Sequence, residues 1–174
     1  RIRSVPAAAG ARAAGAGERQ SSNGGMAGVV LCGGKGSRMG RTRAHKVCEP
    51  IAGRPAVVRL IDTLLAHQIE PVLTLYHWDL PQALQDEYGG WEDRRVIEDF
   101  ERYCVTLYQR FAGKVKYWVS LNEQNYNLTN AYQLGTHPPA VQDRKRFFAA
   151  NHIAFLANAR VIKAFRQHVP NGLI

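Results

Sequence analysis

Two stretches decide the fold: residues 69–78, IEPVLTLYHW, and residues 115–125, VKYWVSLNEQN. Each begins as an apolar run rich in β-branched and aromatic residues, which predicts buried strands over 71–76 and 115–121. Both runs end abruptly in polar side chains. Between them, apolar residues recur every three or four positions from 94 to 111, which predicts an amphipathic helix.

The pattern further along the chain predicts a second amphipathic helix over 147–168, after an irregular stretch over 124–146. Its inward face is expected to carry Phe148, Ile153, Leu156, Ile162 and Phe165. Buried strands that alternate with helices indicate parallel βα units, whose right-handed crossovers bring both strand exits to one side. We therefore expect an α/β fold, a partial (β/α)₈ barrel of two βα units, with a site where the strands end.

The residues at the strand exits suggest carbohydrate chemistry. Glu123 follows an apolar strand, where desolvation would favour the protonated form that a general acid needs. Asn122 and His77 are candidates for binding sugar hydroxyls, and Trp78 and Trp91 for stacking on a sugar ring. The alternative is structural, because a glutamate at a strand end is more often a helix cap or an ion-pair partner.

Other polar residues carry less weight. Asp79 precedes Leu80-Pro81 and is expected to cap a turn rather than act as a second catalytic acid. The histidines lack the spacing of metal ligands, so no metal site is predicted.

Residues 69–174 resemble glycoside hydrolase family 1, the β-glucosidase and 6-phospho-β-glucosidase family. The motifs that carry the resemblance are TLYHWDLPQAL (74–84), GGW (89–91), LNEQN (121–125), THPP (136–139) and NHIAFLANARVIKAF (151–165). They are long and occur in the order of the family. The resemblance implies a TIM-barrel glycosidase that needs no cofactor.

The same resemblance implies roles for single residues. Glu123 matches the acid/base glutamate, Asn122 the residue that binds the 2-hydroxyl, and His77 a histidine that binds other sugar hydroxyls. Trp78 matches the tryptophan of the same motif. Where most β-glucosidases have proline after the glutamate, this chain has Gln124, as in the branch that cleaves 6-phospho-β-glucosides.

The resemblance also implies that the site is incomplete. Retaining hydrolysis needs a second carboxylate about 5–5.5 Å from the acid/base. The family supplies it from a Glu-Asn-Gly motif, and this sequence has none. A full barrel takes about 250 residues. We therefore expect a fragment that is inactive alone, and that self-associates through its unpaired strand edges.

The first third of the chain resembles the start of a sugar-phosphate nucleotidyltransferase. The segment GVVLCGGKGSRMG (28–40) reads as a strand followed by a glycine-rich loop, and IAGRP follows at 51–55. Backbone amides of such loops bind phosphates. The residues implied to bind a nucleoside triphosphate are Gly33, Gly34, Gly36, Ser37, Arg38 and Lys46, with Mg²⁺ a cofactor only under this alternative. For GGKG alone, an ordinary glycine turn is the simpler interpretation.

Charge and composition suggest three segments. Lys and Arg exceed Asp and Glu by 23 to 14, and the excess falls within residues 1–59. We expect a disordered Ala/Gly/Arg-rich tail over 1–25, a nucleotidyltransferase-like fragment over 26–67 and a glycosidase fragment over 68–174. The resemblances meet near residues 64–70, which suggests a chimeric reading frame.

The basic excess leaves a third hypothesis, a non-enzymatic polyanion-binding segment over 1–59. The balanced remainder argues against nucleic acid as a partner. No apolar run is long enough to cross a membrane. Three scattered cysteines fit a reduced, cytoplasmic protein.

Overall fold

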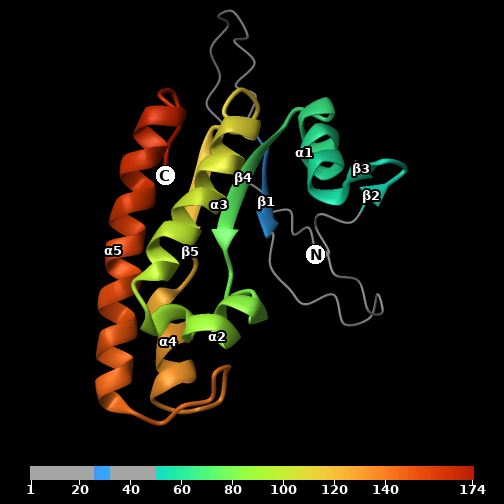
Figure 1. The fold of residues 1–174 in the computed structure, drawn as a ribbon. Coiled ribbons are helices and arrows are strands. Elements are labelled where there is room, and N and C mark those ends of the chain that lie inside the picture. The colour runs from blue at the N-terminus through green and yellow to red at the C-terminus, as the bar shows by residue number, and fades with distance from the viewer. Residues whose placement is uncertain (1–25, 32–49) are drawn as a thin grey trace, which may run out of the picture.

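The computed structural model describes residues 26–31 and 50–174, which form a parallel sheet with helices on its sides (Figure 1). The strands β1 (Met26–Leu31), β4 (Ile69–Tyr76) and β5 (Tyr117–Leu121) lie in the order β1-β4-β5. Met26 lies opposite Ile69, and Val72 lies opposite Tyr117. The predicted parallel arrangement is confirmed for β4 and β5, and β1 extends the same sheet.

Helices α3 (Arg95–Phe111) and α5 (Arg144–His168) pack against each other beside β5, and their apolar faces form most of the core (Figure 1). Tyr108, Trp118 and Phe165 meet there with ring centroids 5.2–6.1 Å apart. The edge-to-face arrangement of these rings is the one that aromatic quadrupoles favour.

The two predicted amphipathic helices are therefore confirmed, with corrections to one buried face. Phe148, expected to face inward, is 55% exposed, while Ile153 and Phe165 are buried. Helix α5 begins three residues earlier than expected because Asp143 accepts hydrogen bonds from the backbone amides of Lys145 and Arg146. An aspartate at this position is a standard helix cap, and it draws the helix start to Arg144.

The stretch expected to be irregular contains helix α4 (Gln124–Tyr132), so that expectation was wrong. The sequence does not indicate this helix, because it contains three asparagines, a residue of low helix propensity, at Asn125, Asn127 and Asn130. The helix is stabilised by tertiary contacts, since it packs on α5 and buries Leu128 and Tyr132. Figure 1 shows α4 and the short helix α2 (Gln82–Tyr88) beneath the ends of β4 and β5. The 3₁₀ turn η2 (Gly90–Glu92) links α2 to α3.

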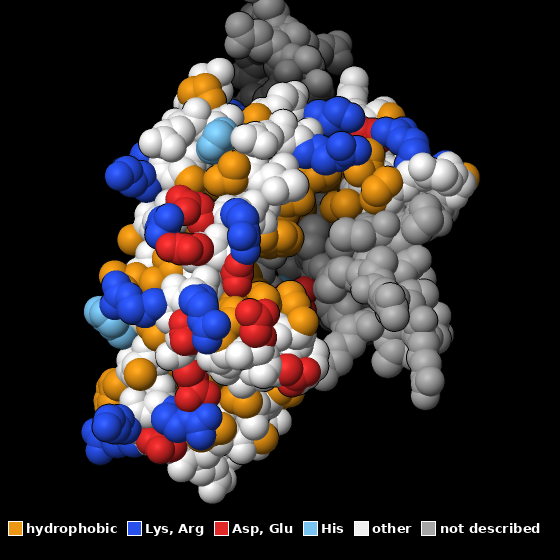
Figure 2. Space-filling model, viewed as in Figure 1, with side chains coloured by type: hydrophobic (Ala, Val, Ile, Leu, Met, Phe, Trp, Pro, Cys, Tyr) orange, Lys and Arg blue, Asp and Glu red, His pale blue; other side chains and the backbone are white. Residues whose placement is uncertain are grey.

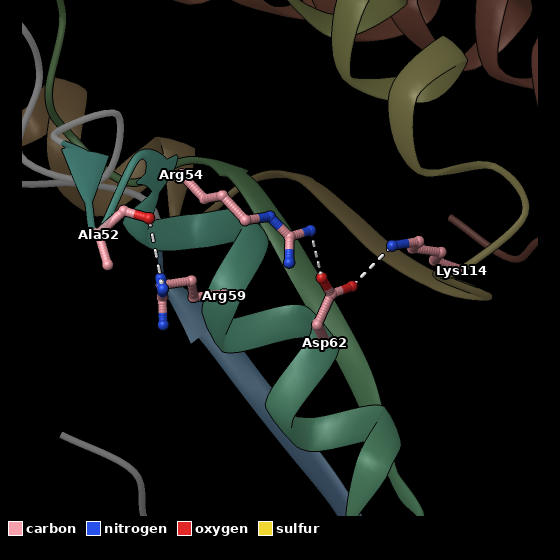
Figure 3. A network of polar contacts seen from close by, with 5 residues as sticks. All are labelled: Ala52, Arg54, Arg59, Asp62 and Lys114. Atoms are coloured by element: carbon pink, nitrogen blue, oxygen red, sulfur yellow. Dashed lines mark hydrogen bonds and ion pairs between the residues drawn. The ribbon is translucent and has the colours of Figure 1, made fainter.

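Helix α1 (Ala56–Ala66) lies on the other side of β4, next to β1, and follows a short hairpin of β2 (Pro50–Ile51) and β3 (Arg54–Pro55). Polar contacts link it to the rest of the molecule (Figure 3). The Asp62 carboxylate accepts hydrogen bonds from Arg54, at 2.7 Å, and from Lys114, at 2.6 Å. Lys114 follows α3, so this network joins α1 to the segment that leads into β5.

The surface of α3 and α5 carries acidic and basic side chains side by side (Figure 2). Arg146 forms an ion pair with Glu92, and Arg160 forms one with Glu101. This confirms the mixed surface expected of the C-terminal part of the chain. None of the helices in the part of the chain that the structure describes is long and apolar enough to cross a membrane.

The far edge of β5 carries the start of a further pairing. Leu173 forms a parallel bridge to Tyr117, through hydrogen bonds from its amide to Lys116 O and from the Trp118 amide to its carbonyl, both 2.8 Å.

Candidate active site at the ends of β4 and β5

The two strand exits lie side by side. Tyr76 is opposite Leu121 in the register, and the amide of Asn122 donates to the Tyr76 carbonyl at 3.0 Å. His77 and the Asn122–Glu123 pair therefore leave the sheet from neighbouring positions on the same edge. The prediction that these residues emerge together is confirmed.

Trp78 connects the two exits. Its indole nitrogen, Nε1, donates to the carbonyl of Asn122 at 2.9 Å, which links residues 44 positions apart. Its ring stacks on His77, with centroids 4.9 Å apart, and its backbone is left-handed, with φ of 68°. The indole of Trp78 has a single N–H group, and the Asn122 carbonyl accepts its hydrogen bond. Trp78 therefore links the two strand exits rather than donating a hydrogen bond to a sugar.

Asp79 has the structural role that its sequence context predicts. Its Oδ1 accepts from the backbone amide of His77 at 3.1 Å. The carboxylate thus accepts the hydrogen bond of a backbone amide two residues earlier in the chain. Asp79 therefore holds the turn after β4.

Glu123 directly precedes α4, and its backbone is in the left-handed conformation, with φ of 44° and ψ of 51°. Its carbonyl accepts from the amide of Asn127, while its side chain does not cap the helix. Within residues 26–31 and 50–174 the carboxylate also forms no ion pair, so the structural alternative of a cap or salt bridge is not supported. A left-handed non-glycine residue costs about 1–2 kcal/mol, and such costs concentrate at functional sites.

The environment of Glu123 differs from the expected one. Its side chain is exposed, so the described residues do not supply the desolvation that the apolar strand end suggested. A strand buries only what its neighbours cover. Among the described residues, the free edge of β5 is paired only at Tyr117, its first residue, by Leu173.

The support beneath the site is buried. The hydroxyl of Tyr76, at the end of β4, accepts hydrogen bonds from Trp91 Nε1 at 3.0 Å and from Asn127 Nδ2 at 3.5 Å. Burial raises the pKa of Tyr76 to about 12. Trp91 is only 4% exposed and packs on Tyr76 and Phe100, so its expected role as a face for a sugar ring is wrong.

A cavity of about 600 Å³ opens next to Glu123, between the end of β5, α4 and α5. It is lined by Leu121, Glu123, Gln124, Asn125, Tyr126, Phe155 and Asn158. Carboxylate and carboxamide groups next to apolar rings suit a polyhydroxylated ligand, because the amides exchange hydrogen bonds with hydroxyls and the rings cover C–H faces.

Two residues of the site were missed by the sequence analysis. Tyr126 and His137 both lie against Trp78, with ring centroids 5.3 and 5.5 Å from it. Tyr126 falls within the stretch expected to be irregular, and His137 is one of the histidines that the sequence analysis set aside because they lack the spacing of metal ligands. The sequence signal was present for both, since Tyr126 directly follows the LNEQN motif and His137 belongs to the THPP motif.

The predicted nucleotide-binding residues lie outside the described residues: Gly33, Gly34, Gly36, Ser37, Arg38 and Lys46. Over the part of the chain that the structure does describe, no group of three or more His, Cys, Asp or Glu side chains is placed to hold a metal ion.

Comparison with known proteins gives a consistent result. The sequence pattern of glycosyl hydrolase family 1 matches residues 55–174, a range that contains α1 and the 64–70 region where the two resemblances meet. An aryl-phospho-beta-D-glucosidase, BglC, of Bacillus subtilis is 68% identical over 115 residues, or 66% of this chain and 24% of that protein. Beta-glucosidase A of Thermotoga maritima is 41% identical over 116 residues, or 67% of this chain and 26% of that protein.

Solved structures agree with the sequence relatives. A beta-glucosidase from Thermotoga maritima in complex with glucoimidazole superposes with a TM-score of 0.65 at 39% identity, over 67% of this chain and 26% of that one. The same enzyme in complex with isofagomine lactam gives the same TM-score at 40% identity. The chain thus spans about a quarter of the length of these two bacterial relatives.

Proposed function

Because the chain belongs to glycosyl hydrolase family 1, we propose that it carries the acid/base half of a retaining β-glycosidase site for β-glucosides or 6-phospho-β-glucosides. One observation carries the proposal. His77, Asn122 and Glu123 leave two adjacent parallel strands at the same edge and are tied together there by Trp78. That edge is where barrel enzymes build their active sites.

The chemistry assigns a distinct task to each residue. Glu123 donates a proton to the glycosidic oxygen in the first step and accepts one from water in the second. Asn122 and His77 bind hydroxyls of the sugar, which holds the reacting carbon near the Glu123 carboxyl. The free position of the Glu123 side chain, outside any ion pair of the described residues, leaves it available for that transfer.

The Glu-Asn-Gly motif that supplies the nucleophile of the family does not occur in this sequence. The second carboxylate must lie about 5–5.5 Å from the acid/base, on the opposite side of the sugar ring. Asp79, the acid in the motif that contains His77, instead accepts a hydrogen bond from the His77 amide and holds the turn after β4. We therefore propose that the 174-residue chain does not hydrolyse glycosides alone.

The phosphorylated substrate is the finer part of the proposal. It is supported by Gln124 after the glutamate and by the 68% identity to a protein named as an aryl-phospho-beta-D-glucosidase. Phosphorylated sugars are formed as bacteria take sugars up, so the proposal of this substrate includes a cytoplasmic location. The nucleotidyltransferase hypothesis for the first third stays a prediction, to be tested by triphosphate titration with variants of Arg38 and Lys46.

Binding of glucoimidazole tests the site directly. Titration of the ¹⁵N-labelled chain is expected to shift the amide signals of Asn122 and Glu123 and the ring signals of His77. The H77A variant (His77→Ala) is expected to weaken the binding, and H152A, a change of an exposed histidine on α5, is the matched control. Shifts that are absent, or that are equally sensitive to both variants, would remove support for a sugar site at this edge.

Turnover tests the incompleteness. Aryl β-glucosides and their 6-phosphates are expected to remain intact with the purified chain. Hydrolysis that is lost in E123Q would show that a nucleophile is present after all, and would overturn the proposal of an incomplete catalytic pair.

A further inference from the structure

The residues around Trp78 form an aromatic cluster with a structure of its own. We define this Trp78 cluster as His77, Trp78, Tyr126 and His137. The Trp78 ring has His77 on it at 4.9 Å and an interplanar angle of 28°, and Tyr126 at 5.3 Å and 31°. His137 lies 5.5 Å from Trp78 and 6.0 Å from Tyr126.

The cluster gathers three separate segments of the chain. His77 and Trp78 follow β4, Tyr126 lies in the first turn of α4, and His137 lies in the loop between α4 and α5. A stacked aromatic pair contributes about 0.5–1.5 kcal/mol beyond the burial of its area. Three ring contacts onto one indole therefore restrict its orientation, and through Nε1 they restrict the Asn122 carbonyl.

The loop that carries His137 is itself attached to α4. Asn130 is only 9% exposed and donates from Nδ2 to the Tyr126 carbonyl at 2.9 Å. Its Oδ1 accepts from the Thr136 hydroxyl at 2.7 Å, and its backbone carbonyl accepts from the amides of Thr136 and His137. Through its side chain and its backbone carbonyl, Asn130 therefore links the turn of α4 that carries Tyr126 to the loop that carries His137.

The backbone at both strand exits needs such support. Trp78 and Glu123 are both left-handed, with φ of 68° and 44°. Residues in this region are disfavoured unless the surroundings hold them. The hydrogen bond from Trp78 to the Asn122 carbonyl joins Trp78 to the peptide group that precedes Glu123.

We propose that Tyr126 and His137 are positioning residues of the site, which act by holding the Trp78 indole on the Asn122 carbonyl and so fix the spacing between His77 and Glu123. The proposal deepens the proposed glycosidase function and rests on it for its meaning. Its physical content, the restraint on Trp78, is independent of any sugar.

The exchange of the Trp78 indole N–H with solvent measures that restraint. The chain has three tryptophans, and the other two indoles are internal references, since Trp91 donates to Tyr76 and Trp118 donates to Val115. The W78F variant (Trp78→Phe) assigns the Trp78 signal in a ¹⁵N spectrum.

We expect Y126L and H137L each to speed exchange of the Trp78 indole by roughly threefold to tenfold, the equivalent of one lost aromatic contact. The rates of Trp91 and Trp118 should stay constant. Y126F keeps the ring and is expected to retain the original rate. F148L is the matched control, because Phe148 is as exposed as Tyr126, at 55% against 54%, and lies on α5 outside the lining of the cavity.

Unchanged Trp78 exchange in both Y126L and H137L would overturn the proposal. Equal acceleration of all three indoles, or acceleration in F148L as well, would also overturn it, because the effect would then be a general loosening. Failure of glucoimidazole to bind leaves this measurement unaffected, so the two proposals fail separately.

Discussion

The α3–α5 helix pair and the carboxyl edge of the sheet are held by different forces. The helix pair is held by apolar contact, with Tyr108, Trp118 and Phe165 nearly fully buried among aliphatic residues. The carboxyl edge is held by directed hydrogen bonds, such as those from Trp78 to Asn122 and from Trp91 to Tyr76. The difference indicates that stability is concentrated in the helix layer, while the exits carry strained and exposed residues.

The largest effect is expected inside the helix pair. F165A removes a buried ring that contacts Tyr108 and Trp118, and should lower the free energy of unfolding by about 3–5 kcal/mol. F148A removes the same side chain from an exposed position of the same helix. Urea denaturation of both variants tests the contrast, and similar losses would contradict the concentration of stability in the core.

A smaller loss is expected from Y76F, beneath the exits. The change leaves Trp91 Nε1 without its acceptor in a buried position, which costs about 1–3 kcal/mol. Y117F, on the neighbouring strand, is the control. A loss in Y76F no larger than in Y117F would show that the directed contact contributes nothing.

Tyr76 also predicts a response to alkali. Because burial raises its folded pKa to about 12, above its ordinary value of 10.0, the unfolded chain loses this proton first. The contribution of Tyr76 to stability is therefore complete below pH 10.0 and is lost as pH rises towards 12. Denaturation across that range should show a smaller decline for Y76F than for the unchanged chain.

A gain is expected at Glu123. Glycine accepts a positive φ without strain, so E123G should raise the free energy of unfolding by up to about 1 kcal/mol, after the added entropy of glycine in the unfolded chain. E123Q keeps the side-chain length and the strain and should change little. A loss of stability in E123G would show that the carboxylate makes a stabilising contact.

The smallest effect is expected at the surface network of Asp62 (Figure 3). Hydrogen bonds from Lys114 and Arg54 hold the pKa of Asp62 below its ordinary value of 3.8. Its contribution is therefore present above pH 3.8 and is lost as pH falls through the lower folded pKa. D62N should lower stability slightly at neutral pH, less so in high salt, and E87Q is the control. A large loss that is insensitive to salt would contradict a surface role.

The sequence alone predicted the elements whose patterns are local. The apolar period over 94–111 and the apolar runs before His77 and Glu123 led to the correct helix and strands, and the expected parallel pairing led to the shared edge. Helix α4 was missed because its three asparagines lack a helical pattern, and its stability comes from packing on α5. The burial of Trp91 was missed because a tryptophan after two glycines gives no sign of which way it faces.

What the sequence determined is therefore the identity and order of the parts: two βα units, a histidine and an asparagine–glutamate pair at their exits, and motifs of one enzyme family. What only the tertiary structure decided is which of these parts contact one another. The indole N–H of Trp78 donates to Asn122, and the rings of Tyr126 and His137 pack against the indole. The side chain of Glu123 remains exposed. The physical reason is that hydrogen bonds and ring contacts between segments far apart in the chain depend on directions that no local pattern encodes.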